Sequence, residues 1–151
     1  NLEITKLFCN FIFVSMKYLG IDFGERRVGL AVGDSELRFA FPRETIDRQL
    51  QELWVRLDEI VLDEKIDRFV VGMPFHPDGR KDGKNKVVEV FIDELREHFP
   101  EIPIFTQDES YSSVQALEQT SYMSRKKKKD KGIVDRAAAT IILQNWLDGN
   151  I

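Results

Sequence analysis

The chain has 151 residues, of which 42% are hydrophobic and 32% charged, and its formal net charge is −4. This length and composition indicate a folded chain about one domain long and exclude an intrinsically disordered protein. Because the net charge is negative, any contact with nucleic acid must come from a local basic patch. The single cysteine, Cys9, excludes an internal disulfide and fits a reducing compartment, so we expect a cytoplasmic protein.

Residues 1–15 precede the first clear structural pattern. Leu7 to Val14 is apolar but too short to span a bilayer, and no cleavage site typical of a signal peptide follows it. Met16 followed by Lys17 resembles a natural start. We therefore predict that residues 1–15 are an upstream extension outside the fold, that residues 16–151 form a single domain, and that no membrane is involved.

The next part of the chain predicts three strands joined by short turns. Lys17 to Phe23 is a compact apolar run, Val28 to Val32 is a second one, and Leu37 to Phe41 alternates between apolar and other residues. Between the first two runs, residues 24–26 predict a tight turn, in which Gly24 permits a positive φ. Three strands with short connections indicate an antiparallel meander.

The remaining chain predicts helices that alternate with strands. The expected elements are a helix at Ile46–Val61 with Thr45 as N-cap, a strand at Phe69–Val71, a helix at Val87–Phe99, a strand at Ile102–Thr106, a helix capped by Ser112 or Ser113, and a helix from about Ile133 to Leu147. Alternation of this kind implies right-handed crossovers and parallel pairing of the later strands. The expected fold class is α/β, with a mixed sheet covered by helices.

Three acidic positions fall where predicted elements begin or end. Asp22 lies at the end of the first strand, Glu109 follows Asp108 just after the last strand, and Asp135 opens the last helix. Because strand carboxyl ends gather at one edge of an α/β sheet, we expect these carboxylates to converge. Converging carboxylates repel one another and lose hydration unless a cation neutralises them.

Oxygen ligands without histidine or cysteine favour Mg²⁺ or Mn²⁺. Two such ions, roughly 3.5–4 Å apart, can activate a water molecule and stabilise the leaving oxygen of a phosphodiester. Each acid also fits an ordinary structural role: Asp22 in a turn, Glu109 on the surface and Asp135 as a favourable anion at a helix start. Their shared placement at one predicted edge favours the metal site.

A basic segment of six cations and one aspartate runs from Arg125 to Lys131 and precedes Asp135. Beside a metal site it would give salt-sensitive contacts to phosphates, although runs of like charge are often only solvated loops. The residues predicted to contact nucleic acid are Arg26, Arg125, Lys126, Lys127, Lys128, Lys129 and Lys131.

These motifs resemble those of the YqgF/RuvX family, described as Holliday junction resolvases and as pre-16S rRNA nucleases, with a ribonuclease H-like fold. The resemblance extends over essentially Met16 to Leu147 and is carried by GIDFGERRVGLAVGD at Gly20–Asp34, VVGMP at Val70–Pro74, DES at Asp108–Ser110 and VDRAAATIILQNWL at Val134–Leu147. It implies a five-stranded sheet of order 3-2-1-4-5 whose first three strands are antiparallel.

The resemblance also implies that Asp22, Glu109 and Asp135 are catalytic residues that bind the metal, with Asp108 as a weaker candidate ligand. In one departure, Ser110 stands where the family usually has an arginine, so a partner for phosphate or carboxylate is lost.

The leading hypothesis is a nuclease that processes the 5′ end of pre-16S rRNA, with ribosomal particles as partners. Resolution of branched DNA is the alternative, and a stable two-fold dimer would favour it over the expected monomer or weak homodimer. Two other classes stay open. Actin-like and sugar-kinase folds begin in the same way but clamp ATP between two lobes, and the site could also be a relic in a noncatalytic module that binds nucleic acid or ribosomes.

Overall fold

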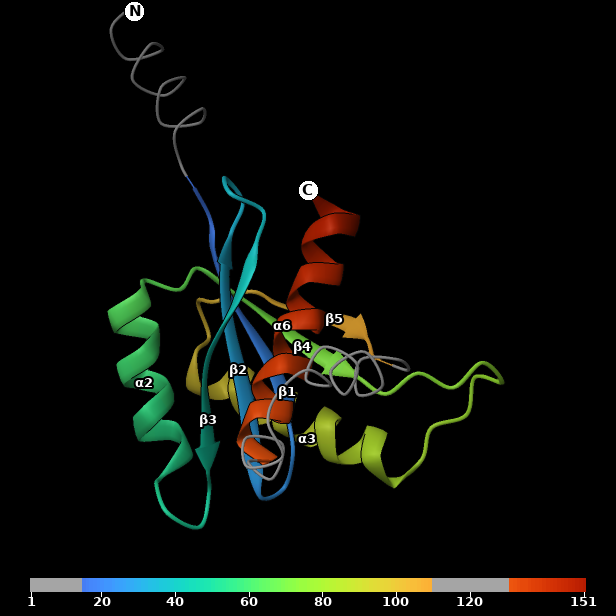
Figure 1. Ribbon diagram of the computed structural model, residues 1–151. Coiled ribbons are helices and arrows are strands. Elements are labelled where there is room, and N and C mark those ends of the chain that lie inside the picture. Colours follow the sequence, from blue (N-terminus) through green and yellow to red (C-terminus); the bar gives the residue numbers. More distant parts are fainter. Residues whose placement is uncertain (1–14, 110–130) are drawn as a thin grey trace, which may run out of the picture.

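The computed structural model describes residues 15–109 and 131–151, which build a five-stranded sheet and three helices (Figure 1). The elements in chain order are β1 (Lys17–Phe23), β2 (Arg27–Asp34), β3 (Ala40–Asp47), α2 (Leu53–Glu64), β4 (Arg68–Met73), α3 (Gly83–His98), β5 (Ile104–Asp108) and α6 (Lys131–Asn150). The strand order is β3-β2-β1-β4-β5, with antiparallel pairing among β1, β2 and β3 and parallel pairing of β4 with β1 and β5. The α/β class and the strand order that the resemblance implied are confirmed.

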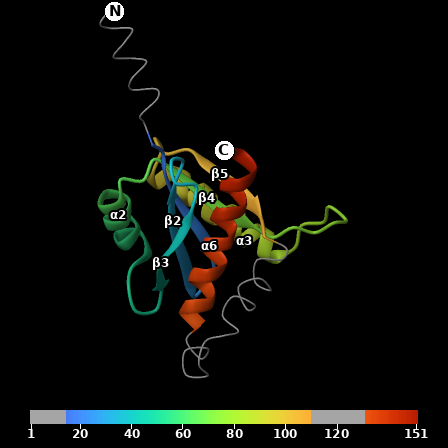
Figure 2. The ribbon, with the colours of Figure 1, turned by 45° about the horizontal axis from the view of Figure 1, so that its top comes forward.

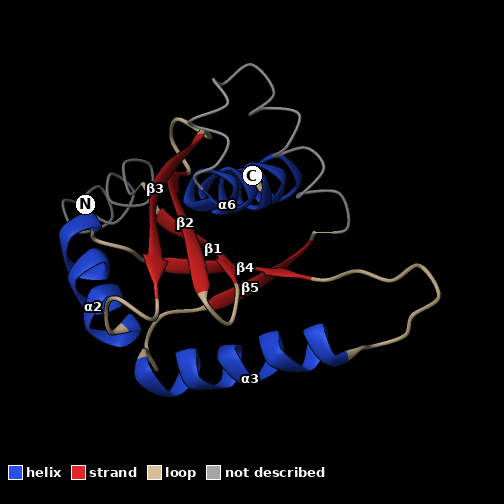
Figure 3. Ribbon diagram, turned by 60° about the horizontal axis from the view of Figure 1, so that its bottom comes forward, coloured by secondary structure: helices blue, strands red, loops and turns tan. Residues whose placement is uncertain are grey.

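The sheet separates two hydrophobic clusters. Figure 3 shows α6 on one face of the sheet and α3 on the other. Alternation along β1 sends Leu19 and Ile21 into the cluster shared with α2 and α3, whereas Tyr18 enters the cluster shared with α6. Tyr18, Gly20 and Asp22 alternate along β1 and so share the face toward α6. The alternation of the strand therefore places Asp22 beneath α6.

Glycines line the sheet where α6 crosses it (Figure 2). A β-carbon added at Gly29 would overlap the backbone carbonyl of Asp135, and one added at Gly20 would lie 2.7 Å from Cβ of Leu143. These close approaches leave no room for a side chain between strand and helix. The absence of side chains at these positions therefore lets α6 lie directly on β1 and β2.

The predicted helix at Ile46–Val61 was wrong at its start. The structure places Thr45 and Ile46 in β3, where Ile46 pairs with Val28 and is fully buried. The helix begins at Leu53, with Glu52 as its N-cap, whose carboxylate accepts a hydrogen bond from the backbone N–H of Val55 at 2.8 Å. Ile46 is apolar because it packs into the core from β3, so its helical spacing from the residues of α2 is coincidental.

The third strand is shifted relative to its prediction, since β3 begins at Ala40 and Leu37 lies in the preceding turn with 60% of its surface exposed. Gly24 does not adopt the positive φ that the turn prediction allowed. Its role is spatial, because a β-carbon there would lie 2.6 Å from the carbonyl oxygen of Arg27.

The other predicted strands and helices within the described ranges agree with the structure to within a few residues. The helix predicted after Ser112 or Ser113 lies outside the described residues. None of the helices described combines the length and hydropathy that crossing a bilayer requires.

Candidate active site

Asp22 lies near the carboxyl end of β1, opposite Gly29 of β2. The preceding residue, Ile21, pairs with Val71 of β4 in parallel register, so Asp22 lies beside Gly72 at the same end of the sheet. The fold thereby places an acid in the interior beneath α6, next to a strand position that has no side chain.

Glu109 reaches Asp22 from the other side of β4. It follows β5, and its backbone N–H donates a 3.1 Å hydrogen bond to the carbonyl of Met73, which continues the parallel β4–β5 pairing by one residue. Its carboxylate lies over Gly72, where Oε2 is 2.8 Å from the position that a β-carbon would take, and only 8% of the side chain is exposed. A hydrogen bond then joins the side chains of Glu109 and Asp22.

The electrostatics of this carboxyl pair are unfavourable without a bound cation. Burial raises the pKa of Asp22 most, and the charge of Glu109, the hydrogen bond to Glu109 and the charge of Asp135 raise it further, to about 7. Burial also raises the pKa of Glu109, although the charge of Lys84 and the hydrogen bond to Asp22 oppose this. When Asp22 is protonated, it donates this hydrogen bond to the Glu109 carboxylate.

Asp135, in the second turn of α6, acts on this pair electrostatically but is bonded elsewhere. Its Oδ2 accepts a hydrogen bond from Nε of Arg27 at 2.9 Å, and both side chains are partly buried. Among the residues that the structure describes, no group of three or more acidic, histidine or cysteine side chains is arranged to hold a metal ion. The structure therefore brings Asp22 and Glu109 into contact and Asp135 into their vicinity.

Two cations of this region were not predicted from the sequence. Arg27 belongs to the same face of β2 as Gly29, which lies under α6, so strand alternation pointed to it. Lys84, in the first turn of α3, has its Nζ 3.8 Å from Oε1 of Glu109. The sequence pointed to Lys84 less clearly, because the start of α3 lies in a stretch that contains glycine and proline and shows no periodic spacing of apolar residues.

The other predicted site residues are less closely tied to the pair. Asp108 is exposed and is not among the groups that shift the pKa of Asp22. Arg26 is 59% exposed, with a nitrogen 3.8 Å from Asp47. Arg125 and Lys126 to Lys129 lie outside the described residues, and for Lys131 only the backbone, at the start of α6, is described.

The donor set fits a hard divalent cation. Asp22 and Glu109 supply only carboxylate oxygens, which suit Mg²⁺ or Mn²⁺. The pKa of both carboxyls is raised although the charge of Lys84 opposes the rise, so the positive charge near the pair only partly offsets the cost of ionising both groups. A divalent ion would supply that charge, with Asp135 as the third carboxylate once it is released from Arg27.

Comparisons with known proteins identify the family to which this chain belongs. Residues 16–149 match the family described as "RuvX: Holliday junction resolvase". A protein of Chlorobaculum tepidum named "Putative pre-16S rRNA nuclease" is 40% identical over 136 residues, which cover 89% of this chain and 94% of that protein. A protein of the same name from Maridesulfovibrio salexigens is 38% identical over 136 residues, covering 87% and 98%.

Solved structures show the same fold at lower identity. The chain of Thermus thermophilus RuvC in complex with a Holliday junction substrate aligns with a TM-score of 0.55 and 18% identity, covering 89% of this chain and 94% of that one. A second T. thermophilus RuvC structure aligns with a TM-score of 0.51 and 16% identity, covering 89% and 95%. With the match over residues 16–149, these findings confirm the resemblance: the chain belongs to the RuvX family, which is described as a family of Holliday junction resolvases, a class of nuclease.

Proposed function

We propose that this chain is a metal-dependent nuclease that hydrolyses phosphodiesters of structured nucleic acid, and that its task is to process the 5′ end of pre-16S rRNA. The observation that carries the proposal is the contact between Asp22 and Glu109, in which burial raises the pKa of both carboxyls and the charge of Glu109 raises that of Asp22 further. A pair that costs stability in the metal-free protein is characteristic of a site built for a ligand.

Asp22 and Glu109 would hold the cation, and Asp135 would complete the set of ligands. A divalent ion bound there supplies a Lewis acid that activates water and stabilises the departing oxygen; a second ion would share this work. Glycines at positions 29 and 72 hold α6 and Glu109 close to β1, so the acids converge without large movements of the backbone. The basic segment Arg125 to Lys131, which precedes Asp135, would contact the phosphates of the substrate.

The choice of RNA rests on the relatives, which are named pre-16S rRNA nucleases at 34–40% identity. The description of the family as a Holliday junction resolvase supports a second candidate, cleavage of four-way DNA junctions. Cutting a junction symmetrically needs two active sites, so this candidate also requires a two-fold dimer in solution.

The decisive experiment compares cleavage of end-labelled pre-16S rRNA fragments and four-way DNA junctions, side by side, in Mg²⁺ and in Mn²⁺. We expect cleavage of the RNA at its 5′ extension by the wild type and none by Asp22→Asn. Asp93→Asn is the matched control, because Asp93 is 74% exposed and pairs only with Arg96 among the interactions described. Cleavage of the junction alone would replace the first candidate with the second. A protein that binds either substrate but neither responds to metal nor cleaves would be a noncatalytic binding module.

The basic segment has its own test. Replacing Lys126, Lys127, Lys128 and Lys129 with glutamine should reduce the slope of log affinity against log salt by about 2–4, since each lost phosphate contact contributes roughly 0.7–0.9. Affinity for Mn²⁺ in the absence of nucleic acid should stay unchanged. An unaltered salt dependence would remove this segment from the proposed substrate contacts.

A further inference from the structure

Lys84 occupies the border between the buried carboxyl pair and solvent. Its Nζ lies 3.8 Å from Oε1 of Glu109, yet 64% of the lysine side chain is exposed, whereas only 8% of Glu109 is. The ammonium group thus contacts the acid on one side and water on the other. Its charge lowers the pKa of both Asp22 and Glu109, so it acts on both members of the pair.

The position of Lys84 is fixed by the residue that follows it. Asn85 is almost fully buried, with 4% of its surface exposed. Its Nδ2 donates a 2.7 Å hydrogen bond to the carbonyl of Pro74, directly after β4. Asn85 and Asp82 also form a capping box with bonds of 3.1 and 3.2 Å. These bonds tie the first turn of α3 to the end of the strand that runs beneath Glu109.

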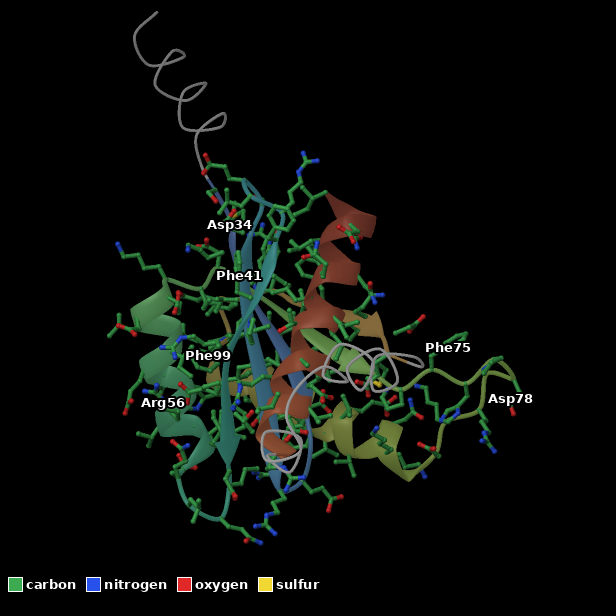
Figure 4. All side chains as sticks on the ribbon, in the orientation of Figure 1. Asp34, Phe41, Arg56, Phe75, Asp78 and Phe99 are labelled. Atoms are coloured by element: carbon green, nitrogen blue, oxygen red, sulfur yellow. The ribbon has the colours of Figure 1, made fainter. Side chains whose placement is uncertain are left out.

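A contact within the loop between β4 and α3 also helps to hold the first turn of α3 in place. The rest of the loop extends away from the sheet. Nε2 of His76 lies 3.0 Å from Oδ2 of Asp82, the N-cap of α3. From Phe75, near the strands, the loop extends outward to Asp78 (Figure 4). These contacts fix the position of the first turn of α3, in which Lys84 lies next to Glu109.

Stability does not explain this arrangement. An ion pair at 3.8 Å with a well-exposed lysine contributes little to folding. A divalent cation on Asp22 and Glu109 would also take over the neutralisation of Glu109 and repel the ammonium group. Lys84 would then no longer pair with Glu109. Its backbone would stay fixed by the bonds of Asn85, and its ammonium group would lie at the solvent-exposed edge of the site. The anion available at that place during the proposed reaction is a phosphate of the bound strand.

We propose that Lys84 is a substrate-binding residue that exchanges its contact with Glu109 for a phosphate group of the nucleic acid when metal occupies the site. This inference rests on the proposed function. It assigns a phosphate contact to the first turn of α3, in addition to the contacts proposed for the basic segment Arg125 to Lys131. It also supplies a cation beside Glu109 in a chain that has Ser110 where the family resemblance predicts arginine.

The test uses the full chain and two probes, Ca²⁺ alone and a fluorescein-labelled RNA hairpin in Ca²⁺, with gels to verify that the hairpin stays intact. Lys84→Gln should reduce the slope of log affinity against log salt by about 0.7–0.9, the value of one phosphate contact. Without the hairpin, the same variant should bind Ca²⁺ about 2–10-fold more tightly, since a competing charge has been removed. Lys84→Arg should retain the wild-type salt slope.

Lys86→Gln is the matched control, because Lys86 is exposed on the same helix and lines a separate surface hollow with Phe23 and Glu94. It should leave both the salt slope and the affinity for Ca²⁺ unchanged. A purely structural role for Lys84 would weaken both kinds of binding or neither, not shift them in opposite directions.

Three results would overturn the inference: an unchanged salt slope in Lys84→Gln, an equal change in Lys86→Gln, or weaker binding of Ca²⁺ in Lys84→Gln. If the wild type binds Ca²⁺ and the hairpin while Lys84→Gln behaves like it, the Lys84 inference fails and the nuclease proposal stands. A wild type that binds neither probe would defeat both.

Discussion

The carboxylate of Glu109 lies in the space that a side chain at Gly72 would fill. A β-carbon at position 72 would be 2.8 Å from Oε2 of Glu109 and 2.5 Å from Cδ1 of Ile142. Glu109 can reach Asp22 on β1 only because the intervening strand, β4, carries no side chain at this point. The glycine of the VVGMP motif is therefore part of the architecture of the carboxyl pair.

Gly72→Ala should displace Glu109 and strain the packing of α6. We expect a loss of about 1–3 kcal/mol in the free energy of unfolding, as for other overpacked interiors, together with weaker binding of Mn²⁺. Urea denaturation and calorimetric titration with Mn²⁺ measure the two effects. Gly149→Ala is the control, because nothing lies within 4 Å of its added β-carbon. A Gly72→Ala protein with wild-type stability and metal affinity would contradict the role given to this glycine.

The metal-free protein should lose stability as pH rises from about 4 to about 7. The Asp22 carboxyl ionises near 3.8 in the unfolded chain and at about 7 in the folded one, so between these values the folded state holds a proton that the unfolded state has released. The full contribution is therefore present below pH 4 and is lost above pH 7; its size is on the order of 4 kcal/mol, because each pKa unit corresponds to about 1.4 kcal/mol.

Asp22→Asn should flatten this dependence and stabilise the metal-free protein at pH 8. Urea denaturation in a chelating buffer at several pH values measures it, with Asp93→Asn as the exposed control. If the wild type and Asp22→Asn show parallel stability profiles, Asp22 does not retain its proton in the folded state.

Binding of Mg²⁺ or Mn²⁺ should strengthen with pH and level off above about pH 7, since a proton on Asp22 competes with the cation. Thermal shift with increasing Mn²⁺ should therefore give a larger rise in Tm at pH 8 than at pH 6. Glu109→Gln should reduce the rise at both pH values. A shift that is independent of pH would indicate that the ion binds elsewhere.

Arg27 and Arg26 are neighbours that should behave differently. Arg27→Gln breaks the partly buried pair with Asp135 and should lower the free energy of unfolding by about 1 kcal/mol. It should also increase affinity for Mn²⁺, because it frees Asp135 and removes a cation. Arg26→Gln should leave stability unchanged, since this side chain is exposed and 3.8 Å from Asp47. Its predicted phosphate contact would appear only as weaker, less salt-dependent binding of RNA. Equal losses of stability in the two variants would refute this distinction.

Strand β1 and its acid were predictable from the sequence, because an apolar run that carries a single aspartate near its end has few other interpretations. The boundary between β3 and α2 was not. Ile46 and Leu50 continue the helical spacing of Leu53 backward, yet Ile46 is buried in a strand and Leu50 is 83% exposed in a turn. Hydrophobic spacing records which residues are apolar; it does not record which of them are buried.

The cations of the site were harder to predict than its acids. The acids lie near the ends of strands or the start of a helix, and the change in the hydrophobic pattern at these points identifies them in the sequence. Lys84 acquires its place through the bond between Asn85 and the Pro74 carbonyl, a contact between a helix and a strand end that no local pattern encodes. Arg27 was within reach of strand alternation, but the choice between it and Arg26 depended on where β2 begins.

The contact of α6 with Gly20 and Gly29 has a consequence for how this site tolerates change. The backbone carbonyl of Asp135 approaches Gly29, and Cβ of Leu143 and the carbonyl of Ala139 approach Gly20, so atoms at or next to the main chain set the separation between helix and sheet there. Exchanges of one aliphatic residue for another in the two hydrophobic clusters can raise or lower the melting temperature while the depth of Asp135 stays constant. The position of Asp135 relative to the sheet should therefore depend more on these two glycines than on the aliphatic residues of the interior.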